Sequence, residues 1–145
     1  MNQNHSPLEL ERFLPYRLSI LSNQVSQAIA DEYQDQFSLA MTEWRVMAVL
    51  ARFEPLSARE VAEHTAMDKV AVSRALSKLV QAGRVDRERH SEDRRRSVLH
   101  LSEEGWRIHN IVAPLAREHE KELLAALEPA EIRTLTRILD KLSPV

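Results

Sequence analysis

Cysteine is absent from this chain of 145 residues. Its absence excludes disulfide bonds, thiolate metal sites and thiol-based redox sensing. The chain also has no run of about 18 apolar residues, so we expect no membrane-spanning helix and no membrane partner. Residues 1–6 lack the basic and apolar segments of a secretory signal, which favours a cytoplasmic location.

Glycine is nearly absent, because only Gly83 and Gly105 occur. Two isolated glycines cannot form the glycine-rich phosphate loops of nucleotide-binding enzymes or the Gly-x-Ser-x-Gly elbow of hydrolases. Six histidines are present, but His119-Glu120 is followed by Leu123 where a zinc-protease helix would have its second histidine. We therefore expect neither an enzyme nor a cofactor. A metal held by histidines and carboxylates is an alternative without support.

Charge is unevenly distributed, although the net charge is only −2. Nine lysines and arginines but four acidic residues lie between Lys69 and Arg96, so this segment carries +5 and the remainder carries −7. With 43% apolar and 29% charged residues, the composition is that of a globular protein. A basic patch on an acidic body can attract DNA to one surface. A solvated charged surface is the alternative.

Two helices are expected in the first third of the chain. Ser6-Pro7-Leu8-Glu9 has the form of a capping box with proline at the first helical position. Pro15 should kink or restart this helix, whose apolar repeat continues to about Asp35. Thr42 is expected to cap a second helix that ends near Phe53.

A short helix, a tight turn and a longer helix come next. Ser57 and Glu60 have capping-box spacing, and the helix that they begin should end near Thr65. Asp68 should cap the following helix, which Gly83 terminates. This order of elements is that of a helix-turn-helix, whose second helix reads the major groove of DNA.

The helix over 69–82 has two distinct faces at 100° per residue. The residues expected to face a core are Val72, Ala75, Leu76, Leu79 and Val80. Hydroxyl, amide and cationic side chains that can bind bases and phosphates dominate the other face, while Val70 can contact a thymine methyl group. The candidate DNA-binding residues on this helix are Lys69, Val70, Ser73, Arg74, Ser77 and Lys78.

A basic hairpin follows this helix. Residues 84–89 and 97–101 alternate polar and apolar side chains, as expected of two antiparallel strands. Their connection includes Arg94, Arg95 and Arg96, and arginines at such a turn can enter a narrow minor groove. The alternatives are a solvated loop or a protein-interaction module whose basic hairpin binds an acidic partner.

Two further helices complete the expected fold. Ser102 should cap a helix that bends at Pro114 and ends near Leu127, and Pro129 should open the last helix. The first and last helices have more apolar surface than a monomer of this size easily covers, which favours a homodimer. Burial of these faces within one chain is the alternative.

The hairpin turn and the residues after it contain Asp93-Arg94-Arg95 and then Leu99-x-Leu101-Ser102-x-x-Gly105. These residues resemble the MarR family of bacterial transcriptional regulators, whose pattern is Asp-x-Arg, Leu-x-Leu-Thr/Ser and Gly. The resemblance extends over nearly the whole chain. It implies that Arg95 enters the minor groove, that Asp93 helps to fix the wing, and that Arg94 and Arg96 contact phosphates or the groove.

The resemblance also implies an architecture and an activity. The fold is expected to be mainly α, with a small two- to three-stranded antiparallel wing. Residues 36–101 would form a winged helix-turn-helix DNA-binding domain, and residues 1–35 and 102–145 a helical dimerisation region. A homodimer of this kind would be a repressor bound to a pseudo-palindromic operator in double-stranded DNA.

Regulators of this family commonly bind small anionic, often aromatic, effectors between the dimerisation helices and the winged domain. Cations and aromatic residues that can supply such a site are Tyr16, Arg17, Met41, Trp44, Arg45 and Met47. Residues 10–26 look like the branch linked to aromatic-acid catabolism, which implies an aromatic acid or an aromatic acyl-CoA thioester as effector. The alternatives are that Trp44 and Met47 belong to the core and that Arg17 forms a surface or dimer-interface ion pair.

Overall fold

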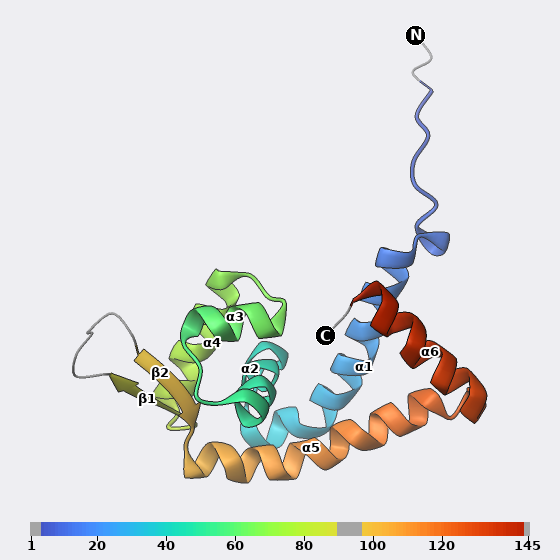
Figure 1. The fold of residues 1–145 in the computed structure, drawn as a ribbon. Helices are drawn as coiled ribbons and strands as arrows, with labels where there is room; N and C mark the ends of the chain where they lie inside the picture. The colour runs from blue at the N-terminus through green and yellow to red at the C-terminus, as the bar shows by residue number, and fades with distance from the viewer. Residues whose placement is uncertain (1–3, 90–96, 144–145) are drawn as a thin grey trace.

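A computed structural model describes residues 4–89 and 97–143. Over these residues the chain is mainly helical, with one small antiparallel sheet (Figure 1). The elements in order are η1 (Leu10–Arg12), α1 (Leu14–Phe37), α2 (Met41–Phe53), α3 (Ala58–Thr65), α4 (Lys69–Gln81), β1 (Val85–Arg89), β2 (Ser97–Leu101), α5 (Glu103–Leu124) and α6 (Pro129–Leu142). No helix among the described residues is both long enough and apolar enough to cross a membrane.

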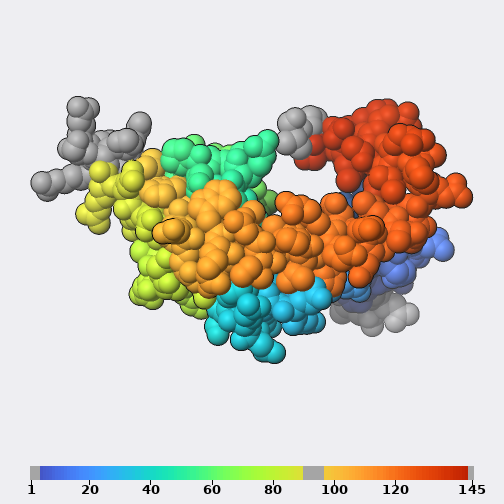
Figure 2. Space-filling model, turned by 90° about the horizontal axis from the view of Figure 1, so that it is seen from below, coloured from blue at the N-terminus to red at the C-terminus, as the bar shows by residue number. Residues whose placement is uncertain are grey.

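The elements form a compact body with a long helical extension. Helix α2 packs against α3, α4 and α5, while the β1–β2 hairpin lies beside α4. Helix α5 begins at the hairpin and crosses beneath this body, and it also packs against α1 (Figure 1). Helix α6 stands at the far end of α5, at the opposite end of the molecule from the hairpin (Figure 2).

The core lies where α2, α4, the hairpin and the first half of α5 meet. Its fully buried side chains include Met47 and Leu50 from α2, Leu79 from α4, Leu99 from β2 and Ile108 from α5. Burial of such side chains stabilises the fold by roughly 1.5–3 kcal/mol each. This core fixes α4 against the hairpin.

The extension, in contrast, leaves apolar side chains uncovered. No residue of α6 is buried, although this helix is strongly amphipathic, and its Leu135, Ile138 and Leu139 are all exposed. Leu14, Leu18 and Leu21 in the first half of α1 are exposed as well. Both helices therefore present apolar faces that a single chain does not cover.

Most of the expected helix ends are confirmed. The Ser57–Glu60 capping box forms, with Glu60 N donating to Ser57 Oγ at 3.2 Å and Ser57 N donating to Glu60 Oε1 at 3.0 Å. Asp68 Oδ1 accepts from Ala71 N at 2.9 Å. Ser102 Oγ accepts from Gly105 N at 3.0 Å. Short-range hydrogen bonds thus set the ends of α3, α4 and α5.

Two expected helix starts were wrong. Ser6 does not begin a helix, and α1 starts at Leu14 with Pro15 in its first turn. A helix running on from Ser6 would place Pro15 in its interior, where the ring clashes with the preceding turn. Thr42 lies inside α2, whose N-cap is Ala40; Glu43 Oε2 accepts from Ala40 N at 3.1 Å and so satisfies the helix start.

The hairpin has the expected pairing and gains a minimal third strand. Val85 pairs with Leu101 and Arg89 with Ser97 in antiparallel register. On the other side of β2, Leu56 N donates to Leu99 O at 3.1 Å and Leu99 N donates to Leu56 O at 2.7 Å. The prediction of a two- to three-stranded antiparallel wing in a mainly α fold is confirmed.

Candidate nucleic-acid interface

Helix α4 divides its side chains between the core and the solvent as its sequence predicts. Val72, Ala75, Leu76 and Leu79 are buried, because they face α2 and the hairpin. Every candidate DNA-binding residue of the helix is exposed, and Val70 retains 60% of its accessible surface. The exposed set is Lys69, Val70, Ser73, Arg74, Ser77 and Lys78. This face can therefore enter a groove without any rearrangement of the core.

The hairpin separates its charges between its two faces. Successive side chains of a strand point to opposite faces, so Arg87 and Arg89 share the face of buried Val85. Asp86 and Glu88 lie on the other face, where their carboxylates are 3.7 Å and 3.9 Å from His100 Nε2. The cations of β1 thus face the same side as α4, and its carboxylates face away.

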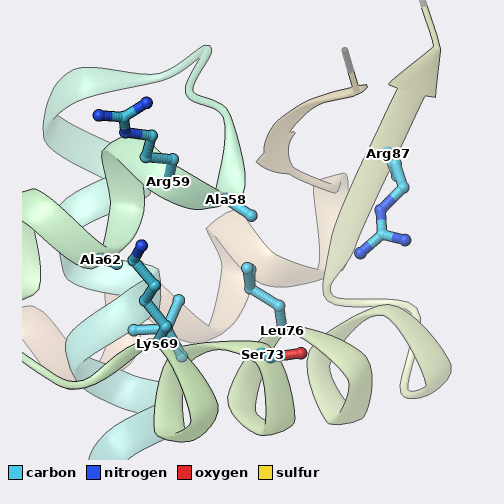
Figure 3. A pocket seen from close by; sticks show the side chains of 8 residues that line it. Ala58, Arg59, Ala62, Lys69, Ser73, Leu76 and Arg87 are labelled. Carbon is cyan, nitrogen blue, oxygen red and sulfur yellow. The ribbon is translucent and has the colours of Figure 1, made fainter. Parts of the chain in front are cut away.

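A pocket of about 240 Å³ lies between α3, α4 and β1 (Figure 3). Its lining residues are Ala58, Arg59, Ala62, Lys69, Val72, Ser73, Leu76 and Arg87. The floor is therefore aliphatic, the rim carries three cations, and none of the lining side chains is a carboxylate. Figure 3 shows Arg87 reaching from β1 towards α4, while Arg59 points away from the pocket centre.

Sequence reasoning placed Lys69 and Ser73 on this surface but missed Arg87. The alternation along β1 does assign Arg87 to the face of Leu99, its partner across the strands. What the alternation could not supply was the distance between β1 and α4, which depends on tertiary packing. Asp93, Arg94, Arg95 and Arg96, the predicted contacts of the wing tip, lie outside the described residues.

Arg84 joins the recognition helix, the hairpin and two other helices. Its backbone N donates to Leu79 O at 2.9 Å, and its carbonyl accepts from Ser102 N at 3.0 Å. Its side-chain Nη2 donates to the carbonyl of Phe37, the last residue of α1, at 2.6 Å. One residue therefore fixes the end of α4 and the starts of β1 and α5 to the C-terminus of α1.

A second pocket, of about 140 Å³, lies between α1 and α2. Three of the candidate effector-binding residues, Met41, Trp44 and Arg45, line it. Its other lining residues are Ser26, Ile29, Tyr33 and Ala48. Trp44 also stacks on His109 of α5, with ring centroids 5.6 Å apart, so the aromatic wall is held from two sides.

The remaining candidate effector residues lie elsewhere in the chain. Met47 has no exposed surface and belongs to the core. Tyr16 and Arg17 are exposed in the first turn of α1. Arg17 precedes Ser26 by nine residues, which corresponds to about 14 Å along the helix. Within one chain, therefore, Tyr16 and Arg17 do not line the pocket.

Tyr33 has an unusual environment at this pocket. Only 1% of its surface is exposed, and its hydroxyl has no hydrogen-bond partner among the described residues. Burial, with a smaller contribution from the carboxylate of Glu43, raises the pKa of Tyr33 to about 12. The phenol is thus a neutral hydrogen-bond donor that is unsatisfied among the described residues.

The described residues contain no cluster of three or more histidine, aspartate or glutamate side chains placed to hold a metal ion. Histidines instead make pairwise contacts. His119 Nε2 lies 2.7 Å from Glu32 Oε2, which links α5 to α1. His64 stacks on Phe53 with ring centroids 4.3 Å apart. These contacts hold helices together.

Comparisons with known proteins agree with this geometry. The model of the MarR family matches residues 37–96, which include α2, α3, α4 and β1. The chain is similar to the HTH-type transcriptional regulator BilQ of Clostridium symbiosum, with 31% identity over 86 residues, or 59% of this chain and 60% of that protein. BilQ is thus a transcriptional regulator of the helix-turn-helix type.

Solved structures extend the likeness to nearly the whole chain. A MarR/EmrR family transcriptional regulator from Acinetobacter shares 31% identity with a TM-score of 0.82, covering 93% of this chain and 95% of that one. The Bordetella bronchiseptica protein BpsR, whose DNA binding is regulated by 6-hydroxynicotinic acid, has the same fold at 19% identity, with a TM-score of 0.80 over 97% of this chain and 99% of that one. The chain belongs to the MarR family of DNA-binding transcriptional regulators.

Proposed function

We propose that the protein is a homodimeric repressor that reads a pseudo-palindromic operator with two copies of α4. The observation that carries this proposal is the outer face of α4, which is exposed, cationic and rigidly backed by the core. Ser73, Arg74 and Ser77 are the base-reading side chains, since hydroxyls and guanidinium groups bind base edges. Lys69 and Lys78 bind phosphates near the two ends of the helix.

The dimer is proposed to form through the uncovered faces of α1 and α6. Ile138 and Leu139 keep 45% and 44% of their surface exposed in one chain. A shallow apolar groove beside them is lined by Leu127 and Leu135. Apolar surface of this extent marks an interface, and a twofold dimer presents two recognition helices to successive major grooves. Residues 1–35 and 102–145 thus form the dimerisation region, and residues 36–101 the DNA-binding domain.

The wing tip is proposed to complete each half-site. Arg95 enters the minor groove and Asp93 fixes the wing, as in the family pattern that the sequence matches. Arg94 and Arg96 contact phosphates or the groove. Narrow minor grooves concentrate negative potential, so arginine at this position favours A·T-rich flanks.

The pocket between α1 and α2 is the proposed effector site. It combines the aromatic wall of Trp44, the unpartnered phenol of Tyr33 and the cation of Arg45. This combination suits a small aromatic carboxylate, because the ring can stack while the carboxylate accepts from the phenol and pairs with the cation. That BpsR responds to 6-hydroxynicotinic acid, an aromatic acid, supports this class of effector.

Tyr16 and Arg17 fit this proposal only through the second subunit. In the proposed dimer the first half of α1 packs against the partner chain, so these residues can approach the partner's pocket. An effector that binds one spacing of the two α4 helices better than the other shifts the equilibrium between DNA-bound and free protein. An aromatic acyl-CoA thioester is the larger candidate effector.

The test combines sedimentation, DNA binding and calorimetry on the full-length protein. Sedimentation equilibrium should give a dimer, and operators selected from random duplexes should contain an inverted repeat. Calorimetry with benzoate, hydroxycinnamates and their CoA thioesters should give heat for at least one class. A monomer bound to asymmetric sites would overturn the dimeric reading, and no heat with any of these compounds would remove the aromatic effector.

A further inference from the structure

We infer that the pocket between α3, α4 and β1 holds the sugar–phosphate strand that separates the two DNA grooves, with Arg87 as its principal phosphate ligand. This inference rests on the proposed placement of α4 in the major groove and of the hairpin in the minor groove. It adds a third contact, between the two groove contacts, that reads no bases. Arg87 becomes a residue that sets the register of the protein on the duplex.

The position of the pocket follows from the position of its walls. One wall is α4, the opposite wall is β1 of the hairpin, and α3 closes the end (Figure 3). When a recognition helix and a wing occupy adjacent grooves, the strand between those grooves must pass between the two elements. The first helix of a helix-turn-helix likewise crosses the DNA backbone. Residues of α3, α4 and β1 can therefore all contact the same DNA strand.

The lining matches the chemistry of that strand. Lys69 and Arg87 stand on opposite walls, and no lining side chain is a carboxylate. Ala62, Val72 and Leu76 form an aliphatic floor that can pack against deoxyribose, Ala58 lies exposed at the rim, and Ser73 supplies a hydroxyl. Arg59 contributes less to this site, because its Nε lies 3.4 Å from Glu63 Oε1 and its side chain points away.

The charge separation of β1 strengthens the assignment to Arg87. Its sequence neighbours Asp86 and Glu88 lie on the opposite face, near His100. The hairpin thus presents a cation to the pocket while its carboxylates are kept away from the DNA. A phosphate at the pocket meets attraction from both walls, with no carboxylate in the lining to oppose it.

The first experiment is a chemical double-mutant cycle with selected operator duplexes. Arg87→Ala should weaken binding roughly tenfold, on specific and random duplexes alike, and should lower the slope of log affinity against log salt by about one. Neutral methylphosphonates are then placed one at a time along the strand. The wild-type protein should lose affinity at one or two positions between the grooves, and Arg87→Ala should lose nothing further there. Additive losses at every position would overturn the inference.

A second variant separates contact from folding. Ala58 is exposed at the first position of α3, where an added carboxylate favours the helix dipole. Ala58→Glu should therefore fold at least as stably as wild type, yet bind DNA roughly tenfold more weakly, because its carboxylate repels the phosphate. Ala58→Gln, the neutral isostere, should bind nearly as wild type. Equal DNA affinity of the two variants would contradict the inference.

The outcomes distinguish this inference from the proposed function. If Arg74→Ala alters base preference while Arg87→Ala changes neither affinity nor salt slope, the function stands and the strand contact fails. A small anionic molecule is the other possible occupant. In that case benzoate should perturb the backbone amide NMR signals of Ala58 and Ser73, and Arg87→Ala should leave the salt slope of DNA binding unchanged. This pair of results would assign the pocket to the small anion and overturn the inference. The matched control is Arg133, which at 100° per residue lies on the side of α6 away from Leu135 and Leu139, so that Arg133→Ala should leave both the dimer and DNA binding unchanged.

Discussion

The guanidinium of Arg84 donates a 2.6 Å hydrogen bond to the carbonyl of Phe37, and this contact joins the start of the hairpin to the end of α1. Phe37 lies one helical turn after Tyr33, which lines the pocket between α1 and α2. Arg84 itself directly follows the turn that ends α4. The Arg84 side chain therefore couples α1, at the pocket, directly to the end of α4 and the start of the hairpin.

Arg84→Met should loosen this connection. The Phe37 carbonyl loses its charged donor, so the free energy of unfolding should fall by about 1–2 kcal/mol in urea denaturation. Operators with one base pair inserted or deleted between half-sites should then be bound with less discrimination than by wild type. Arg84→Lys, which retains a donor, should restore part of both properties. Unchanged spacing preference in Arg84→Met would show that Arg84 serves stability alone.

Gly105→Ala should destabilise the protein, although alanine normally favours a helix over glycine. An added Cβ would clash with the carbonyl oxygen of Arg84, so the backbone of α5 or of the turn before β1 must shift. We expect a loss of about 2–3 kcal/mol in the free energy of unfolding.

Gly83→Ala is the matched comparison. Gly83 has a φ of +72° but nothing within 4 Å of an added Cβ. Only the left-handed backbone conformation then opposes alanine, at about 1–2 kcal/mol. Thermal or urea unfolding of both variants should show the larger loss for Gly105→Ala, and the reverse order would contradict the close contact.

Tyr33→Phe should stabilise the ligand-free protein by about 1 kcal/mol, because a buried hydroxyl without a partner is removed. The same variant should bind an aromatic carboxylate more weakly, since the ligand loses its donor. Calorimetry and urea unfolding measure the two effects. A loss of stability would indicate that the hydroxyl is already hydrogen-bonded.

Tyr33 should also shape the response to alkaline pH. Its pKa is raised from 10.0 to about 12 in the folded protein, so the unfolded chain ionises first as the pH rises. The stability that depends on the neutral phenol is complete below pH 10 and is lost as the pH approaches 12. Wild type should therefore lose more stability than Tyr33→Phe across this interval, as unfolding at successive pH values can show.

Leu139→Glu should separate dimerisation from folding. Leu139 is exposed in one chain, so a glutamate there should leave the unfolding of the winged body nearly unchanged. In the proposed dimer the carboxylate would be buried without a partner, which is strongly unfavourable. Sedimentation should then show monomers with weakened operator binding. A fully dimeric Leu139→Glu would place the interface elsewhere.

Local signals in the sequence located most of the elements. Ser57, Asp68 and Ser102 each cap a helix through a hydrogen bond to a residue three positions on, so short windows suffice to find them. The exposed face of α4 followed from helical periodicity alone. The predicted helix starts at Ser6 and Thr42 were wrong because other residues fit a helix start better. Pro15 occupies the first turn of α1, and Glu43 accepts a hydrogen bond from Ala40 N at the start of α2.

Sites that depend on distant segments were harder to predict. Met41, Trp44 and Arg45 were found because they lie within one helix, but the pocket's Tyr33 comes from α1 and was treated only as part of an apolar repeat. Arg87 was counted as charge and placed in the first strand of the hairpin, but its position beside α4 was not predicted. In both cases the missing information was which segments pack together, and neither residue carries a local pattern that specifies it.

The chain's two glycines flank the same residue. Gly83 precedes Arg84 in sequence, and Gly105 packs against the Arg84 carbonyl. Ser102 Oγ donates to Gly83 O at 2.6 Å and closes the arrangement. The DNA sequence specificity can therefore be changed by substitutions confined to the outer face of α4 over 69–78, because these leave the contacts among Gly83, Arg84, Ser102 and Gly105 intact. A chimera joined anywhere between 83 and 105 would instead combine Gly83 and Arg84 from one protein with Ser102 and Gly105 from another. The contacts between these residues would then be mismatched, and the orientation of α4 relative to α5 should change.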